Sequence, residues 1–149
     1  VESKKTALYV SEDLGESWKV VNDANGSVKG RPFYFSLLVV DPKDYKKVYK
    51  PATTTAVSRD GGKTFTSIAN STHSDHHALW INPNNPNHLF LGTDGGVYES
   101  VDGGNAFRFL RGLPVSQFYH VYADNQSPYN VYGGLQDNGT WTAPSRKSG

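Results

Sequence analysis

Apolar and polar positions alternate over short stretches of this chain, and clusters of Gly, Pro, Asn and Asp separate these stretches. A period of two between turn residues is typical of half-buried β-strands. The pattern predicts four strands, near 34–40, 47–50, a stretch ending at Ser58, and 64–69. The same four elements are predicted again near 78–81, 89–92, 97–100 and 107–110. We therefore expect an all-β protein built from repeated groups of four antiparallel strands.

An eight-residue motif occurs three times, and each copy fits Ser-x-Asp-x-Gly-x-(small or hydroxyl)-aromatic. The copies are Ser11–Trp18, Ser58–Phe65 and Ser100–Phe107, so successive copies start 47 and 42 residues apart. This spacing is close to the period of about 40–50 residues expected of four-stranded propeller blades. The repeat therefore predicts a β-propeller.

A second marker repeats with the same period at a different place in each unit. Val40-Asp41-Pro42 is followed by Val48-Tyr49, and Ile81-Asn82-Pro83 is followed by Leu89-Phe90. Ala123-Asp124-Asn125, followed by Val131-Tyr132, is a looser third copy. We expect residues 1–149 to be part of one propeller, with the end of a blade over 1–29, blades over 30–71 and 72–112, and an incomplete blade over 113–149.

The octets have a structural interpretation. The Asp carboxylate can accept backbone N–H bonds within a hairpin turn, and the Gly can adopt a positive φ that other residues resist. The aromatic residue is expected to pack down between blades. Asp13, Asp60 and Asp102 are accordingly predicted to stabilise turns and not to act as catalytic acids.

The composition narrows the class of protein further. The 149 residues carry 15 basic and 14 acidic side chains, which gives no support for a nucleic-acid partner. No apolar run is long enough for a transmembrane helix, so we expect a soluble chain without membrane insertion. The absence of Cys excludes disulfides and thiolate chemistry, and the absence of Met suggests a piece of a longer protein. The remaining blades of that protein are then its first expected partner.

The octets resemble the Asp box, also called the bacterial neuraminidase repeat. Further stretches extend the likeness to secreted bacterial Asp-box propeller proteins, described as sortilin-like or glycosyl-hydrolase-like, over about Ala7 to Ser145. These stretches are Arg31–Phe35, Asp75–Pro83, Gly92–Tyr98, Leu113–Tyr119 and Tyr132–Gly139. The resemblance implies a secreted or periplasmic location. Because this fold class includes sialidases, xyloglucanases and sortilin-type peptide receptors, it does not select one function.

Candidate functional residues lie where inner strands begin and where second strands end, on the side away from the octets. Ring geometry would bring such positions from neighbouring blades around one axis. The predicted set is polar and aromatic, as binding loops on a rigid scaffold commonly are. It comprises Arg31, Tyr34, His73, Asp75, His76, His77, Asp94, Gln117, Tyr119, His120, Gln136, Asp137 and Asn138.

The His73-Ser74-Asp75-His76-His77 cluster invites a metal hypothesis, but its geometry is unfavourable. A spacing of four places two His on one face only in a helix, and adjacent residues of a strand point to opposite sides. We expect no metal and no cofactor here. Two hypotheses for the cluster stay open: a ligand-binding group facing the channel, and a hydrogen-bonded structural turn.

Two functional hypotheses follow. The favoured one is a module that binds a protein, peptide or glycan, with His76, His77, Gln117, Tyr119, Gln136 and Arg31 as ligand-binding residues. The alternative is a glycoside hydrolase resembling xyloglucanases, which needs two carboxylates about 5–9.5 Å apart; Asp75, Asp94 and Asp137 are the candidates. A sialidase has little support, because of the five Arg residues only Arg31 precedes an inner strand.

Overall fold

The computed structural model describes residues 6–24, 26–31, 34–113 and 116–146. It divides into two compact units, residues 1–110 and 111–149, each of which is described by itself. The protein is all-β except for one helical turn, α1 (Gly26–Lys29), in which Gly30 N donates to Gly26 O at 2.9 Å. The strand pattern did not predict this turn. Among the described residues, no helix is long and apolar enough to cross a membrane.

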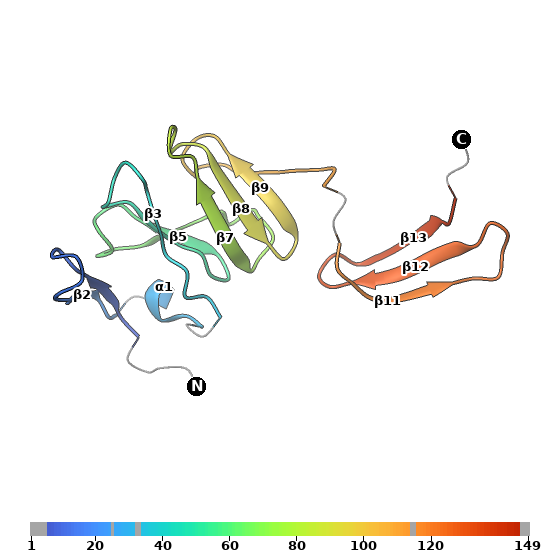
Figure 1. The fold of residues 1–149 in the computed structure, drawn as a ribbon, viewed down its shortest axis with the longest axis horizontal. Helices are drawn as coiled ribbons and strands as arrows, with labels where there is room; N and C mark the ends of the chain where they lie inside the picture. Colours follow the sequence, from blue (N-terminus) through green and yellow to red (C-terminus); the bar gives the residue numbers. More distant parts are fainter. Residues whose placement is uncertain (1–5, 25, 32–33, 114–115, 147–149) are drawn as a thin grey trace. The chain divides into compact units, whose positions relative to one another are not determined.

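The first unit contains three antiparallel sheets (Figure 1). The first sheet pairs β1 (Leu8–Val10) with β2 (Lys19–Asn22). The second runs in the order β3 (Val39–Val40), β4 (Val48–Lys50), β5 (Thr55–Ser58) and β6 (Thr66–Ile68). The third consists of β7 (His76–Ile81), β8 (Leu89–Thr93), β9 (Gly96–Ser100) and β10 (Arg108–Phe109), again with chain neighbours paired.

The second unit is a three-stranded antiparallel sheet. Its strands are β11 (Phe118–Ala123), β12 (Asn130–Leu135) and β13 (Thr140–Pro144), paired in chain order. The four sheets of the chain thus fall one each within the four segments predicted as blades. That these segments belong to a single closed propeller stays a prediction.

One predicted strand is much shorter in the structure. The alternation predicted an inner strand over 34–40, whereas β3 covers only Val39–Val40. The backbone N–H groups of Tyr34 and Phe35 both donate to Arg31 O, at 3.0 and 2.9 Å. These bonds curl the start of the segment into a turn, so its backbone does not join the strand ladder.

The core lies between the second and third sheets. The second sheet contributes Tyr49 and Val57, and Ala69 follows its last strand. The third sheet contributes the apolar residues of β7 and β8, which are Leu79, Ile81, Leu89 and Leu91. Alternate positions of β7 and β8 face this cluster, as the period of two predicts. Burial of these side chains holds the two sheets together.

The three octets form the same hydrogen-bonded turn. In each, the N–H of the fifth residue, glycine, donates to the first-position serine Oγ at 2.7–2.9 Å, and that glycine has a φ of 90–97°. The serine hydroxyl donates to the Asp carboxylate, which accepts the N–H of the seventh residue at 2.9–3.0 Å. The Asp-box carboxylates are Asp13, Asp60 and Asp102.

The octet aromatics differ in their packing. Phe107 packs against the core between the second and third sheets, as expected. Trp18 is 63% exposed and folds back on its own turn, with its Nε1 donating to Gly15 O at 3.1 Å. The expectation that every octet aromatic packs between blades is therefore wrong for Trp18, because the first octet has no part in that core cluster.

The second repeated marker also forms one recurring turn. Asp41, Asn82 and Asp124 each accept, through Oδ1, the N–H two residues further on, at 2.9–3.1 Å. The N–H of each donates across the turn, at 2.9–3.1 Å, to a carbonyl oxygen at the start of the next strand or directly before it. Both sequence markers therefore correspond to side chains that accept backbone bonds within turns.

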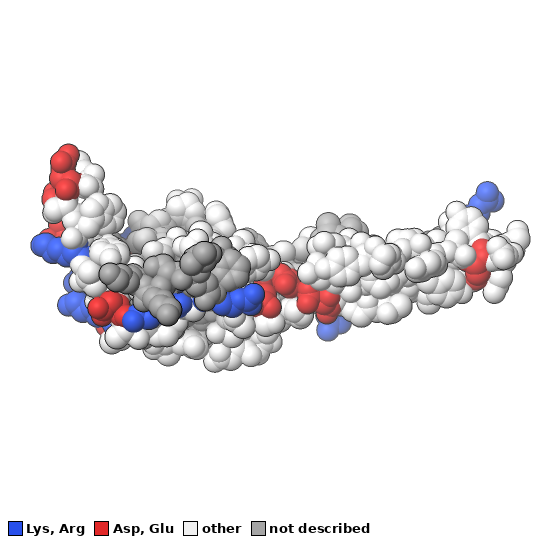
Figure 2. All heavy atoms as spheres, turned by 90° about the horizontal axis from the view of Figure 1, so that it is seen from below, with Lys and Arg blue, Asp and Glu red and all other residues white. Residues whose placement is uncertain are grey.

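Backbone bonds define two ends of the first unit. At one end, which we call the octet end, Gly61 N donates to Lys46 O and Gly103 N to Asn87 O, at 2.8 and 2.9 Å. It comprises the loops 41–47, 58–65, 82–88 and 100–107. At the other, which we call the rim end, the loops 51–54, 69–75 and 94–95 meet. On the face drawn in Figure 2, acidic and basic side chains lie in small mixed groups.

Candidate functional site

Backbone hydrogen bonds bring the loops of the rim end together. Asp75 N donates to Thr53 O at 3.0 Å and His76 N donates to Ala52 O at 2.8 Å, which joins the second sheet to the third. Asp94 N donates to Asp75 O at 3.1 Å. The predicted residues Asp75, His76 and Asp94 therefore lie within one bonded set of loops, away from the octets.

The most developed side-chain cluster at this end surrounds His77. Its Nε2 lies 2.8 Å from Asp94 Oδ1, and both side chains are about one-third exposed. The His77 ring packs against Tyr34 and Phe35, each with ring centroids 5.3 Å away. Tyr34 is 57% exposed, whereas Phe35 is buried. The result is an exposed phenol ring next to an oriented carboxylate.

Arg31 completes this cluster from the segment before β3. Its guanidinium carbon lies 5.7 Å from the centre of the Tyr34 ring and 5.5 Å from that of Phe35. Such contacts attract the cation to the ring face. Arg31 has a φ of 41°, a strained value for a residue with a side chain, and the Tyr34 and Phe35 N–H bonds to its carbonyl maintain it. We call Arg31, Tyr34, Phe35, His77 and Asp94 the aromatic cluster.

His76 points the opposite way from His77. It is 1% exposed, with Nδ1 2.8 Å from Thr55 Oγ1 and Nε2 2.9 Å from both Thr72 Oγ1 and His73 O. Burial lowers the pKa of His76 below its ordinary value. These contacts connect the 72–75 loop to β5. A role of His76 in ligand binding stays a prediction.

The rest of the His73–His77 segment is held by local contacts. His73 N donates to the Tyr98 hydroxyl at 3.0 Å, and a Cβ added at Gly95 would lie only 2.4 Å from the His73 ring. Asp75 adopts a φ of 58°, which Asp tolerates better than most residues. Within the described ranges, no three His, Cys, Asp or Glu side chains are placed to hold a metal ion.

The second unit repeats part of this arrangement with different side chains. Gln136 N donates to Gln117 O at 3.1 Å, which is the bond that Asp94 and Asp75 make in the third sheet. Asp137 has a φ of 67°, and Asn138 N donates to Gln136 O at 2.9 Å. Tyr119 and His120 are exposed on β11. That these residues meet Asp75 and Asp94 around a common axis stays a prediction.

Sequence reasoning missed two residues of this region. Phe35 was part of the family-like stretch but was not a predicted site residue, although it carries the contacts to Arg31 and His77. Lys50 was expected to end an ordinary strand, yet it is 5% exposed. Its position directly after the apolar pair Val48-Tyr49 in a short strand was the available signal.

No known protein-family profile and no curated protein matches the sequence. Among solved structures, the chain is similar to a GH74 enzyme of Niastella koreensis, with a TM-score of 0.55 and 21% identity. The similarity covers 94% of this chain and 25% of the enzyme, so the chain spans about a quarter of that protein's length. It also matches an ancestral GH74 enzyme at a TM-score of 0.41 and 15% identity, over 95% of this chain and 29% of that one. The chain has the all-β fold of part of a GH74 β-propeller.

Proposed function

We propose that the rim end of the first unit is part of a carbohydrate-binding surface on an extracellular or periplasmic β-propeller. The observation that carries the proposal is the aromatic cluster, in which the exposed Tyr34 ring contacts both the Arg31 guanidinium and the perpendicular His77 ring. Side chains packed in this way present a rigid platform that loses little conformational freedom when a ligand binds.

The chemistry of the cluster suits a sugar. One face of a pyranose ring carries mostly C–H groups, which can lie on an aromatic face, while its hydroxyls need donors and acceptors around the edge. Tyr34 supplies the ring, and the Asp94 carboxylate, oriented by His77 at 2.8 Å, supplies acceptors beside it. Binding sites commonly combine an aromatic surface with a few placed polar groups in this way.

The fold adds support of a different kind. A solved structure that shares it is described as a GH74 enzyme, and this likeness supports a role in carbohydrate binding. In this family of folds, function depends on the loops that the sheets carry. The remaining blades of the same protein would supply the rest of the binding surface.

Substitution of Tyr34 tests the proposal. Binding of the intact protein to a panel of plant and bacterial polysaccharides, measured by affinity electrophoresis and calorimetry, should weaken about tenfold in Tyr34→Ala, because one ring stack is lost. Tyr45→Ala is the matched control, since Tyr45 is exposed at the octet end. Equal binding by wild type and Tyr34→Ala, or an equal loss in both variants, would contradict the proposal.

A glycoside hydrolase is the second candidate. It is favoured by the bond from Asp94 N to Asp75 O, which brings two of the three candidate carboxylate residues to one loop junction. Asp94→Asn and Asp137→Asn should then each lower polysaccharide turnover by several orders of magnitude with the fold intact, as loss of a catalytic acid or nucleophile does. Unchanged turnover in both variants would assign these carboxylates to turns.

A further inference from the structure

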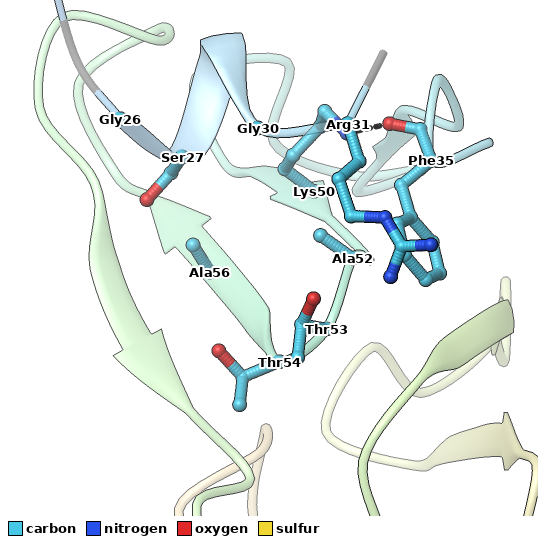
Figure 3. A pocket seen from close by; sticks show the side chains of 10 residues that line it. All are labelled: Gly26, Ser27, Gly30, Arg31, Phe35, Lys50, Ala52, Thr53, Thr54 and Ala56. Atoms are coloured by element: carbon cyan, nitrogen blue, oxygen red, sulfur yellow. Dashed lines mark hydrogen bonds between the residues drawn. The ribbon is translucent and has the colours of Figure 1, made fainter. Parts of the chain in front are cut away.

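A cavity of about 240 Å³ lies beside the aromatic cluster and shares Arg31 and Phe35 with it (Figure 3). Its other walls come from the α1 turn, from Lys50 at the end of β4, and from the 52–56 segment that includes the β4–β5 connection. At about 30 Å³ per water, it has room for about eight waters, or for one substituted sugar unit. Its size and position suit an extension of the binding surface.

Lys50 is the unusual group in this wall. Its side chain is buried, and its Nζ donates to Phe35 O and, at 3.4 Å, to Pro51 O. Both acceptors are neutral carbonyls, and an ammonium group has three donor hydrogens. None of the described lining residues is acidic, and no ion pair to Lys50 is formed within the described part of the chain.

A buried ammonium without a carboxylate partner is costly. Removing a charge from water disfavours the charged form unless an opposite charge compensates it. Burial accordingly lowers the pKa of Lys50. An anion in the cavity would supply the missing charge and an acceptor for the remaining N–H.

A second cation borders the same cavity. The Arg31 guanidinium stays protonated in proteins and offers planar donors that suit a carboxylate. Both cations contact Phe35, because Lys50 donates to its carbonyl oxygen and Arg31 lies over its ring. In Figure 3 the hydroxyl-bearing side chains of Thr53 and Thr54 form the wall across from these two residues. Two cations and two hydroxyls thus surround one space.

We propose that this cavity binds the carboxylate of an acidic sugar, with Lys50 and Arg31 as its cationic partners and Tyr34 beneath the sugar ring. The inference rests on the proposed function and narrows its ligand to a glycan that contains uronic acid. A carboxylate is favoured because the planar guanidinium of Arg31 can bind it through two parallel bonds.

The test compares two ligands with the same sugar chain, one with free carboxylates and one with neutral methyl esters. Trigalacturonate and its fully methyl-esterified form are titrated into the intact protein at constant ionic strength, together with inorganic phosphate. Wild type should bind the acid about tenfold more tightly than the ester, the gain expected of a charge-assisted pair. Lys50→Met should abolish this preference and leave ester binding within about twofold. Arg31→Gln should also abolish the preference, and it should weaken binding of both ligands because Arg31 contacts the Tyr34 ring. Lys63→Met, at the octet end, is the matched control and should keep the preference for the acid.

The outcomes separate the two proposals. Equal binding of acid and ester by wild type, or a preference that survives in both variants, would overturn the acidic-sugar inference and leave the carbohydrate proposal standing. Phosphate that competes as strongly as trigalacturonate would also overturn it, since the cavity would then be a general anion site. If no polysaccharide of the panel and neither trimer binds, the proposed function fails as well. Arg31→Gln keeps the test decisive should Lys50→Met not fold, because Arg31 lies in a turn outside the core.

Discussion

The two ends of the first unit are built on different principles. At the octet end, the turns 58–65 and 100–107 repeat the same bonds with nearly the same distances and glycine φ values, and the turn 11–18 forms them as well. At the rim end, Asp94 N donates to Asp75 O, and the second unit forms the corresponding bond between Gln136 and Gln117 with different side chains. The bonds that recur in the repeats are therefore those that the fold requires. The side chains that differ between repeats are the positions at which binding chemistry can vary.

This contrast has a physical basis. An octet forms its turn with its own Ser and Asp side chains within eight residues, and neighbouring segments add to it, as Asn22 Nδ2 does by donating to Gly62 O and Lys63 O at 3.1 and 2.8 Å. The rim end gains its contacts from residues about 40 positions apart, such as Phe35 with His77, and from loops joined across two sheets. Substitutions at the octet end should therefore change stability without changing binding. Substitutions at the rim end should change both.

The largest effect is expected from His76→Ala, which would test that coupling. The variant leaves the buried Thr55 hydroxyl without its partner and opens a cavity, so unfolding free energy should fall by about 2–4 kcal/mol. Polysaccharide binding should weaken too, because the 72–75 loop loses its anchor. Denaturant unfolding measures the stability, and the polysaccharide panel measures the binding. His120→Ala is the control, because His120 is exposed. Full binding by a strongly destabilised His76→Ala would show that the two properties are independent here.

His76 also predicts a pH dependence. Its folded-state pKa is lowered by burial, so the unfolded chain takes up a proton more readily once the pH falls below the ordinary histidine value of about 6.5. Stability should decrease as the pH falls from about 7.5 to about 5.5. Melting temperatures across this range should show the slope in wild type, and the slope should be smaller in His76→Ala. An identical slope in both proteins would assign it to other groups.

A smaller effect is expected from Asp60, with no loss of binding. The Thr64 hydroxyl and N–H and the Ser58 hydroxyl donate to this carboxylate and lower its pKa to about 2. Its stabilisation is present above the ordinary pKa and is lost as the pH falls from about 4 to about 2. Asp60→Ala should lower the melting temperature at pH 7 by about 2–4 °C and flatten this acid dependence. Weakened glycan binding by the folded variant would place the octets on the binding side.

The smallest effect concerns the fourth position of the octet. Leu14 has a φ of 60° there, where Gly61 and Gly103 have 76° and 74°. Leu14→Gly should raise the unfolding free energy by up to about 1 kcal/mol, because relief of strain outweighs the entropy of glycine. Gly61→Ala should lower it by about 1 kcal/mol, since its Cβ would meet nothing within 4 Å and only the backbone is strained. Chemical denaturation of both variants measures the two changes in unfolding free energy. A Leu14→Gly variant that is less stable than wild type would contradict this explanation.

The sequence alone predicted the parts of this protein whose interactions are local. The octet turns, the Asx turns at Asp41 and Asn82, and the positions of most strands could be predicted because donor and acceptor lie within eight residues of each other. Period-two alternation likewise predicted a strand near 78–81, which lies within β7. That the candidate residues form a functional side of the protein stays a prediction.

Only the tertiary structure decided which of these residues face solvent and which meet. A register shift between His76 and Ala78 accompanies the burial of His76 and the exposure of His77, and alternation alone could not say which of the two is inside. Lys50 became a buried cation because β4 is buried along its whole length. The aromatic cluster exists because Arg31 accepts two turn bonds and so shortens β3, which leaves Tyr34 and Phe35 beside His77. Such contacts depend on how sheets stack, and stacking is set by long-range packing that no short sequence motif encodes.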